Sequence, residues 1–139
     1  MKTNSKSIEQ LENDYWKDEI IFPSNLVINC HKYRKISIKN LTTEQLRLLI
    51  SQKIGIEYLA EIAIEKLELN ILAEGDLYEG DLLEAVLDLP TEFWNEKPVE
   101  FQTFQNLIKR NSELIKTELG EKKSDRINEK IKTSAQQCL

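Results

Sequence analysis

One segment, residues 56–69, constrains the fold of this chain more than any other part of its sequence. Apolar residues recur in it at i, i+3, i+4, i+7 and i+11, the spacing of a single helical face: Ile56, Leu59, Ala60, Ala63 and Leu67. The chain has only 4 glycines and 3 prolines in 139 residues, which leaves few turn residues for many short strands. We therefore predict an all-α fold, a single compact domain of about six to eight helices.

Capping signals place further helices before this segment. Ser7 with Gln10, and Thr42 with Gln45, have the spacing of a capping box, in which a hydroxyl and an amide satisfy backbone groups at a helix start. The first box predicts a helix that continues to Trp16, and the second predicts one that ends near Gly55. Ser24 or Asn25 can cap another helix between them.

Glycine and proline mark the later helices. Asp81 follows Gly80 and is expected to begin a helix that Pro90 stops, and Pro98 suits the first turn of a last long helix that closes at Gly120. Beyond Gly120 the large apolar residues are Ile127, Ile131 and Leu139. We therefore expect a helical domain over residues 1–119 and a polar C-terminal tail over 120–139, either a frayed helix or disordered.

The sequence shows neither the pattern of a membrane span nor that of a secretory signal. No stretch approaches the roughly 18 apolar residues of a membrane span, and the first residues lack the apolar core of a secretory signal. We expect a cytoplasmic protein that does not engage a membrane. Cys30 and Cys138 are then expected as thiols, since disulfides are uncommon in a reducing cytosol.

Little in the sequence points to catalysis, a cofactor or a metal. His31 is the one histidine, and its neighbour Cys30 would project about 100° away from it on a helix, so the two do not form a nucleophile and base. We expect Cys30 in the core and His31 at the surface or as a cap. Phosphate-binding glycine motifs and calcium-loop spacing are missing. We predict a protein that is not an enzyme and needs no metal or cofactor.

Acidic residues are concentrated in the middle of the chain. Residues 41–104 carry 4 basic and 14 acidic side chains, whereas the net charge of the whole chain is −5. Four of the acidic residues fall within about 80° of helix circumference, opposite the apolar face of residues 56–69: Glu57, Glu61, Glu65 and Glu68. This stripe is either a solvated face that keeps the protein soluble or a docking surface for a basic partner such as a nuclease.

A basic run, Lys32–Tyr33–Arg34–Lys35, lies at the expected end of the helix that begins near Ser24. Such a run can interact with the negative end of the helix dipole or contact nucleic acid. Because the chain as a whole is acidic, we favour the dipole and expect no direct nucleic-acid binding.

Five short segments of the sequence together resemble bacterial contact-dependent growth inhibition immunity proteins. They are, in order, IEQLENDYW (8–16), CHKYR (30–34), LTTEQLR (41–47), QKIGIEYL (52–59) and AEGDLYEGDLL (73–83), so that the resemblance spans residues 7–89. It implies a small helical protein that binds the cognate C-terminal toxin domain of a contact-dependent growth inhibition effector and blocks it. Such toxins are often nucleases. It also implies structural roles for shared residues: Gly55 and Gly75 in turns or caps, Tyr15 and Trp16 as core aromatics, and Tyr58 as a packing anchor.

We therefore predict an inhibitor that covers the active site of its toxin with an acidic surface. The expected contact residues are Glu57, Glu61, Glu65, Glu68, Asp76, Glu79, Asp81 and Glu84. The alternative is a helical oligomerising or regulatory adaptor that uses its final helix and tail. Whether the chain is a monomer or a weak dimer stays open.

Overall fold

The computed structural model describes residues 5–17 and 24–137, and its named elements are all helices. The α-helices of this part are α1 (Ile8–Glu12), α2 (Asn25–Tyr33), α3 (Thr43–Ser51), α4 (Ile56–Leu69), α5 (Asp81–Leu87), α6 (Thr91–Asn95), α7 (Pro98–Arg110), α8 (Ser112–Leu119) and α9 (Glu121–Gln137), with one 3-10 helix, η2 (Ile38–Asn40). The all-α prediction is confirmed, although the described residues form nine α-helices rather than six to eight. None of these helices combines the length and apolarity that a membrane crossing requires.

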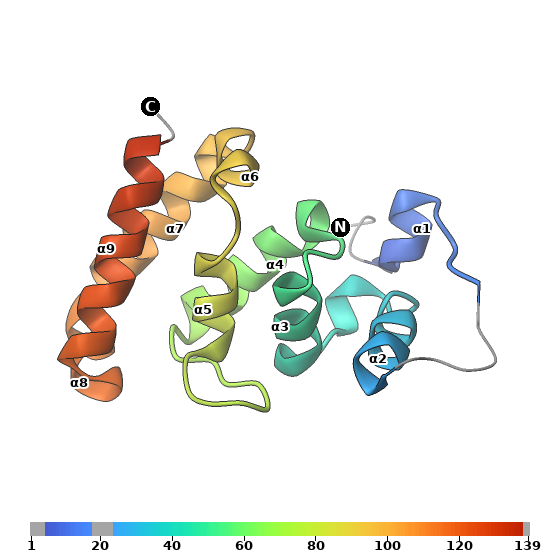
Figure 1. Ribbon diagram of the computed structural model, residues 1–139, viewed down its shortest axis with the longest axis horizontal. Helices are drawn as coiled ribbons and strands as arrows, with labels where there is room; N and C mark the ends of the chain where they lie inside the picture. The colour runs from blue at the N-terminus through green and yellow to red at the C-terminus, as the bar shows by residue number, and fades with distance from the viewer. Residues whose placement is uncertain (1–4, 18–23, 138–139) are drawn as a thin grey trace.

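The helices follow one another along the long axis of the molecule (Figure 1). Helices α1 and α2 form one end, α3, α4 and α5 the centre, and α6 to α9 the other end, with α8 against α9. Helix α4 passes behind α5 in this view and packs against α3, α5 and α7. One apolar core connects these parts, from Ile8 of α1 to Ile127 of α9.

Aromatic side chains fill the core under α6 and α7. Trp94 is fully buried, and its ring stacks on Phe104 with 5.5 Å between centroids and 11° between planes. Phe93 and Phe101 contact the same indole at 5.2 Å. The short helix α6 thus positions the largest core side chain.

Both capping boxes are present. The Ser7 hydroxyl accepts from the Gln10 amide while the Gln10 side chain accepts from the Ser7 amide, and Thr42 and Gln45 make the same pair of bonds. Helix α1 nevertheless ends at Glu12, because Asn13 adopts a left-handed conformation with φ 53°. The predicted continuation to Trp16 is therefore wrong.

The aromatic pair after α1 departs from the expected core placement. Tyr15 is 58% exposed, so its assignment to the core is wrong, and Trp16 is only half-buried. Tyr58 packs against the core as expected, and its hydroxyl donates to the Leu11 carbonyl at 3.5 Å. Gly55 precedes α4 with φ 64°, where an added Cβ would lie 2.8 Å from Ile8 Cδ1, so the close contact between α1 and α4 needs glycine.

The last long helix of the sequence prediction is two helices. Asn111 leaves the helical conformation at φ −103°, ψ 15°, and its side-chain amide donates to the Leu107 carbonyl at 2.8 Å. The Asn111 backbone amide donates to the same carbonyl at 3.2 Å, so both donors of Asn111 cap the end of α7, and α8 begins at the next residue. The starts of α5 at Asp81 and of α7 at Pro98 agree with the prediction.

The C-terminal segment is helical, which is one of the two forms expected for it, but the helix is packed rather than frayed. Residues 121–137 form α9, which packs on α8 and α5 and buries Ile127 fully. Ile131 and Ala135 are only partly buried against the core, and the other buried residues of α9, Ser124 and Ser134, are small and polar, which explains why the sequence gives a weak apolar signal there. The division of the chain at residue 119 stays a prediction.

Candidate functional site

The predicted acidic stripe lies on the exposed side of α4. Glu57, Glu61, Glu65 and Glu68 are all exposed, whereas the apolar residues of the same helix face the core. The last three of these glutamates line a hollow of about 300 Å³ between α4 and α7. Three of the four stripe glutamates therefore form one wall of a groove, and Glu57 lies outside it.

Helix α7 provides the opposite wall of this groove. Val99, Glu100 and Thr103 line it, and Val99 is 73% exposed. A second hollow of about 170 Å³ shares Glu68 and Thr103 and reaches Arg110 at the end of α7. We call the surface formed by Glu61, Glu65, Glu68, Val99, Glu100 and Thr103 the α4–α7 groove.

Glu100 is a groove residue that the sequence reading did not identify. It lies in the first turn of α7, where an acidic side chain is expected simply because it suits the helix dipole. Its position beside the α4 glutamates results from the packing of α7 on α4, residues far apart in the chain. Local spacing carries no signal for such a neighbour.

Many acidic side chains outside the groove are paired with basic ones, whereas within the described part of the chain the groove carboxylates form no ion pair. Among residues 5–17 and 24–137, no ion pair involves Glu57, Glu61, Glu65, Glu68 or Glu100. Acidic residues of other helices are paired, for example Glu44 with Arg47 and Glu9 with Lys35. The negative charge of the groove is therefore available to a partner.

The other four predicted contact residues do not form one surface. Asp76 and Glu79 are exposed in the segment between α4 and α5, and Glu84 is half-buried on α5. Asp81 is only 2% exposed, so its assignment to an accessible surface is wrong. Its place at the first position of α5 turns its carboxylate back onto the chain that precedes it.

Two carboxylates hold four consecutive backbone amides of this segment. Asp81 accepts from the amides of Gly75 at 2.7 Å, Leu77 at 3.1 Å and Tyr78 at 3.4 Å. Glu44 of α3 accepts from the amide of Asp76 at 2.8 Å. A Cβ at Gly75 would lie 2.5 Å from Glu44 Oε1, so this approach needs glycine. We call residues 74–79 the clamped loop.

Arg47 connects the two carboxylates that hold the clamped loop. Its guanidinium donates to both oxygens of Glu44, at 2.7 and 2.6 Å, and its Nε lies 3.8 Å from Asp81 Oδ2. The hydrogen bond from Arg47 lowers the pKa of Glu44 below its ordinary value, against the opposing effect of partial burial, and the Asp76 amide lowers the pKa further.

The lowered pKa of Glu44 makes its contribution to stability depend on pH. Because its pKa is lower in the folded chain, the stabilisation is fully present above the unfolded pKa of about 4.3 and is lost as the pH falls through the folded value. We expect Glu44→Gln to be less stable than the parent at pH 7, with a difference that shrinks below about pH 4. Urea denaturation across pH measures it, with the exposed Glu113→Gln as control; a difference independent of pH would contradict this role.

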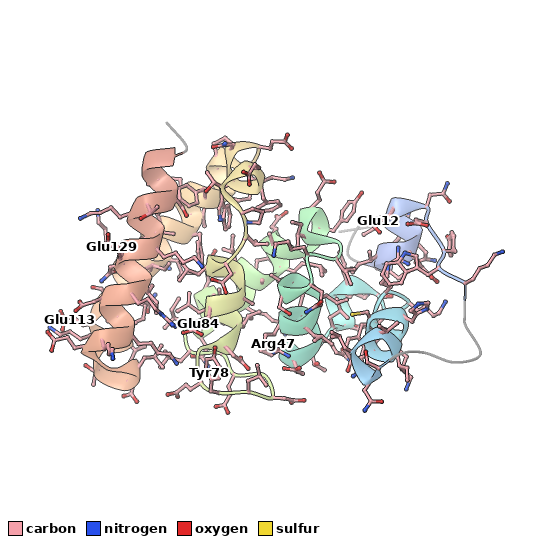
Figure 2. The ribbon with its side chains drawn as sticks, in the orientation of Figure 1. Glu12, Arg47, Tyr78, Glu84, Glu113 and Glu129 are labelled. Atoms are coloured by element: carbon pink, nitrogen blue, oxygen red, sulfur yellow. The ribbon has the colours of Figure 1, made fainter. Side chains whose placement is uncertain are left out.

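Glu84 is occupied by partners from the loop and from α9. Figure 2 shows Tyr78 and Glu84 together near the start of α5. The Tyr78 hydroxyl donates to Glu84, which raises the pKa of Tyr78 to about 12. Arg126 and Lys123 of α9 pair with the same carboxylate. Glu84 therefore ties α9 to α5 and is largely neutralised within the chain.

Of the basic run at the end of α2, Arg34 is turned inward, whereas Lys32 and Lys35 are exposed. Arg34 is 1% exposed; its Nη2 donates to Glu12 Oε1 at 2.9 Å and to the Asp14 carbonyl at 2.8 Å. Its guanidinium also lies 4.0 Å from the Trp16 ring centroid. The sequence reading missed this role, because the partners of Arg34 are about 20 residues away in the chain.

The cysteine and histidine that the sequence singles out belong to the same end of the molecule. Cys30 is buried and free, as predicted, and burial raises the pKa of its thiol. Cys138 lies outside the described residues. His31 is half-buried rather than at the open surface, and the centroid of its ring lies 5.1 Å from the centroid of the Trp16 ring. No group of three His, Cys, Asp or Glu side chains within the described part is placed to hold a metal ion.

Comparison with known proteins gives one match. A family model described as CDI immunity proteins matches residues 10–104, which include α2 to α6 and most of both walls of the α4–α7 groove. No curated protein matches the chain. No solved structure matches it either.

Proposed function

This chain belongs to the family of CDI immunity proteins, and we propose that it neutralises its cognate toxin domain by direct binding through the α4–α7 groove. Immunity proteins of this kind act by binding rather than by catalysis. The observation that carries the choice of surface is the set of exposed, unpaired glutamates on α4, joined by Glu100 of α7. We place this action in the cytoplasm, as one protein chain to one toxin domain.

The charge of the groove supports a nuclease as the toxin. A nuclease must hold phosphates in a positively charged cleft. A surface with several uncompensated carboxylates and one exposed apolar side chain, Val99, is complementary to such a cleft in charge. If the surface that forms the α4–α7 groove covers this cleft, nucleic acid has no access to the active site.

Long-range attraction would also make the inhibition fast. Opposite charges on two proteins raise the association rate by steering their encounter, and this effect weakens as salt screens the charges. An immunity protein benefits from this because it must bind the toxin before the toxin finds its substrate. The excess of acidic side chains in residues 41–104 supports such steering.

Co-expression tests the proposed function. The chain would be produced with the toxin domain encoded immediately upstream of it, in cells that the toxin alone kills. We expect survival and a stoichiometric complex that co-purifies and loses nuclease activity. Cell death without a complex would overturn the assignment of this toxin, and survival without a complex would overturn direct inhibition.

A further inference from the structure

The clamped loop combines a fixed backbone with side chains that face away from the chain. Four of its amides, from Gly75 to Tyr78, are bonded to Asp81 and Glu44. Its side chains at Asp76, Leu77 and Glu79 are exposed, and Leu77 is 61% exposed. Burial of the Asp81 carboxylate costs free energy, because it removes the group from water. The amides that donate to it and the nearby Arg47 offset this cost.

Rigidity of this kind matters for binding. A flexible loop loses conformational freedom when a partner orders it, and this loss weakens the complex. In the clamped loop the backbone is already held, and the bond from Tyr78 to Glu84 holds its end against α5. The loop can therefore present Leu77 to a partner with little further ordering.

The chemistry around Leu77 defines the partner surface. In the sequence Leu77 lies between two acidic residues, Asp76 and Glu79, and all three side chains are exposed. An apolar pocket rimmed by lysine or arginine is complementary to this arrangement. The toxin domain that the α4–α7 groove is proposed to bind is a basic partner of this chemistry.

We propose that the clamped loop is a second contact segment, which inserts Leu77 into an apolar pocket with a basic rim on the cognate toxin domain. Asp81, Glu44 and Arg47 are positioning residues, since they hold the loop without facing the partner. This inference rests on the proposed function. It adds a contact outside the groove, on a segment that follows α4 in the chain.

Substitution of one exposed leucine tests the inference. Leu77→Ala is expected to weaken binding to the co-expressed toxin domain by about tenfold or more, mainly through faster dissociation. Leu114→Ala is the matched control, because Leu114 is 44% exposed on α8, and it is expected to bind as the parent does. Both side chains are exposed, so both variants should keep the thermal stability of the parent.

The outcomes separate this inference from the proposed function. If the parent chain does not bind the toxin domain, the proposed function fails, and this inference fails with it. If the parent binds and Leu77→Ala binds equally well, only the loop contact is wrong. Hydrogen exchange of the free chain tests the clamp itself: we expect slow exchange at Gly75, Leu77 and Tyr78, and exchange at the rate of an unstructured peptide would overturn the preformed loop.

Discussion

Replacement of Glu61, Glu65 and Glu68 together by lysine is expected to slow association with the toxin domain by about 10- to 1000-fold at low ionic strength. The three carboxylates are exposed, line one groove and take part in none of the ion pairs among the described residues, so their charge acts on the partner. The variant should also lose most of the salt dependence of the association rate. Stopped-flow measurements of association across salt concentrations give both quantities.

A charge-matched control separates steering by the groove from a change in total charge. Glu113, Glu118 and Glu129 are exposed on α8 and α9, and replacing them by lysine changes the net charge by the same amount. Figure 2 shows Glu113 and Glu129 at the α8–α9 end of the molecule. We expect a much smaller effect from this control. Equal effects from both triple variants would mean that only net charge matters and that the groove is not the contact surface.

Ile127→Ala is expected to lower the free energy of unfolding by about 2–5 kcal/mol. Ile127 is fully buried and is the one side chain of α9 in the shared apolar core of the described residues. The substitution leaves a cavity between α9 and the helices that it covers. Denaturant unfolding measures the change, and Asn128→Ala, at the exposed neighbouring position, should stay within about 0.5 kcal/mol of the parent.

This second prediction also addresses the adaptor alternative. A tail that serves as an interaction element for another protein would be expected to contribute little to the stability of the domain before it. Ion pairs of α9 with Glu84 of α5 and with Asp88, the residue that follows α5, indicate the opposite. An unchanged stability of Ile127→Ala would contradict the packing of α9 and favour the adaptor.

Local sequence signals predict the helix starts well. The two capping boxes, the periodic segment of α4, and the starts of α5 and α7 depend on residues at most a few positions apart, and the structure has them where the sequence indicates. The ends of helices are harder to predict, because each depends on the conformation of a single residue. The backbone leaves the helical conformation at Asn13 after α1 and at Asn111 after α7.

The candidate site could be predicted only in part from the sequence. Helical periodicity places the four α4 glutamates on one exposed face, since that requires nothing beyond the helix itself. Whether Asp81, Glu84 and Arg34 are buried and bonded depends on partners from other segments of the chain. Arg126 is such a partner for Glu84, and Glu12 for Arg34. Spacing alone does not distinguish a charge that is buried and bonded from one that faces solvent.

Carboxylate footprinting of the complex tests directly whether the α4–α7 groove contacts the toxin domain. Carbodiimide labelling with mass spectrometry would compare the accessibility of each carboxylate in the free chain and in the purified complex with the toxin domain. We expect strong protection of Glu61, Glu65, Glu68 and Glu100, with Glu113 and Glu129 labelled as in the free chain. Equal labelling of the four groove glutamates in the free and bound chain would contradict this contact.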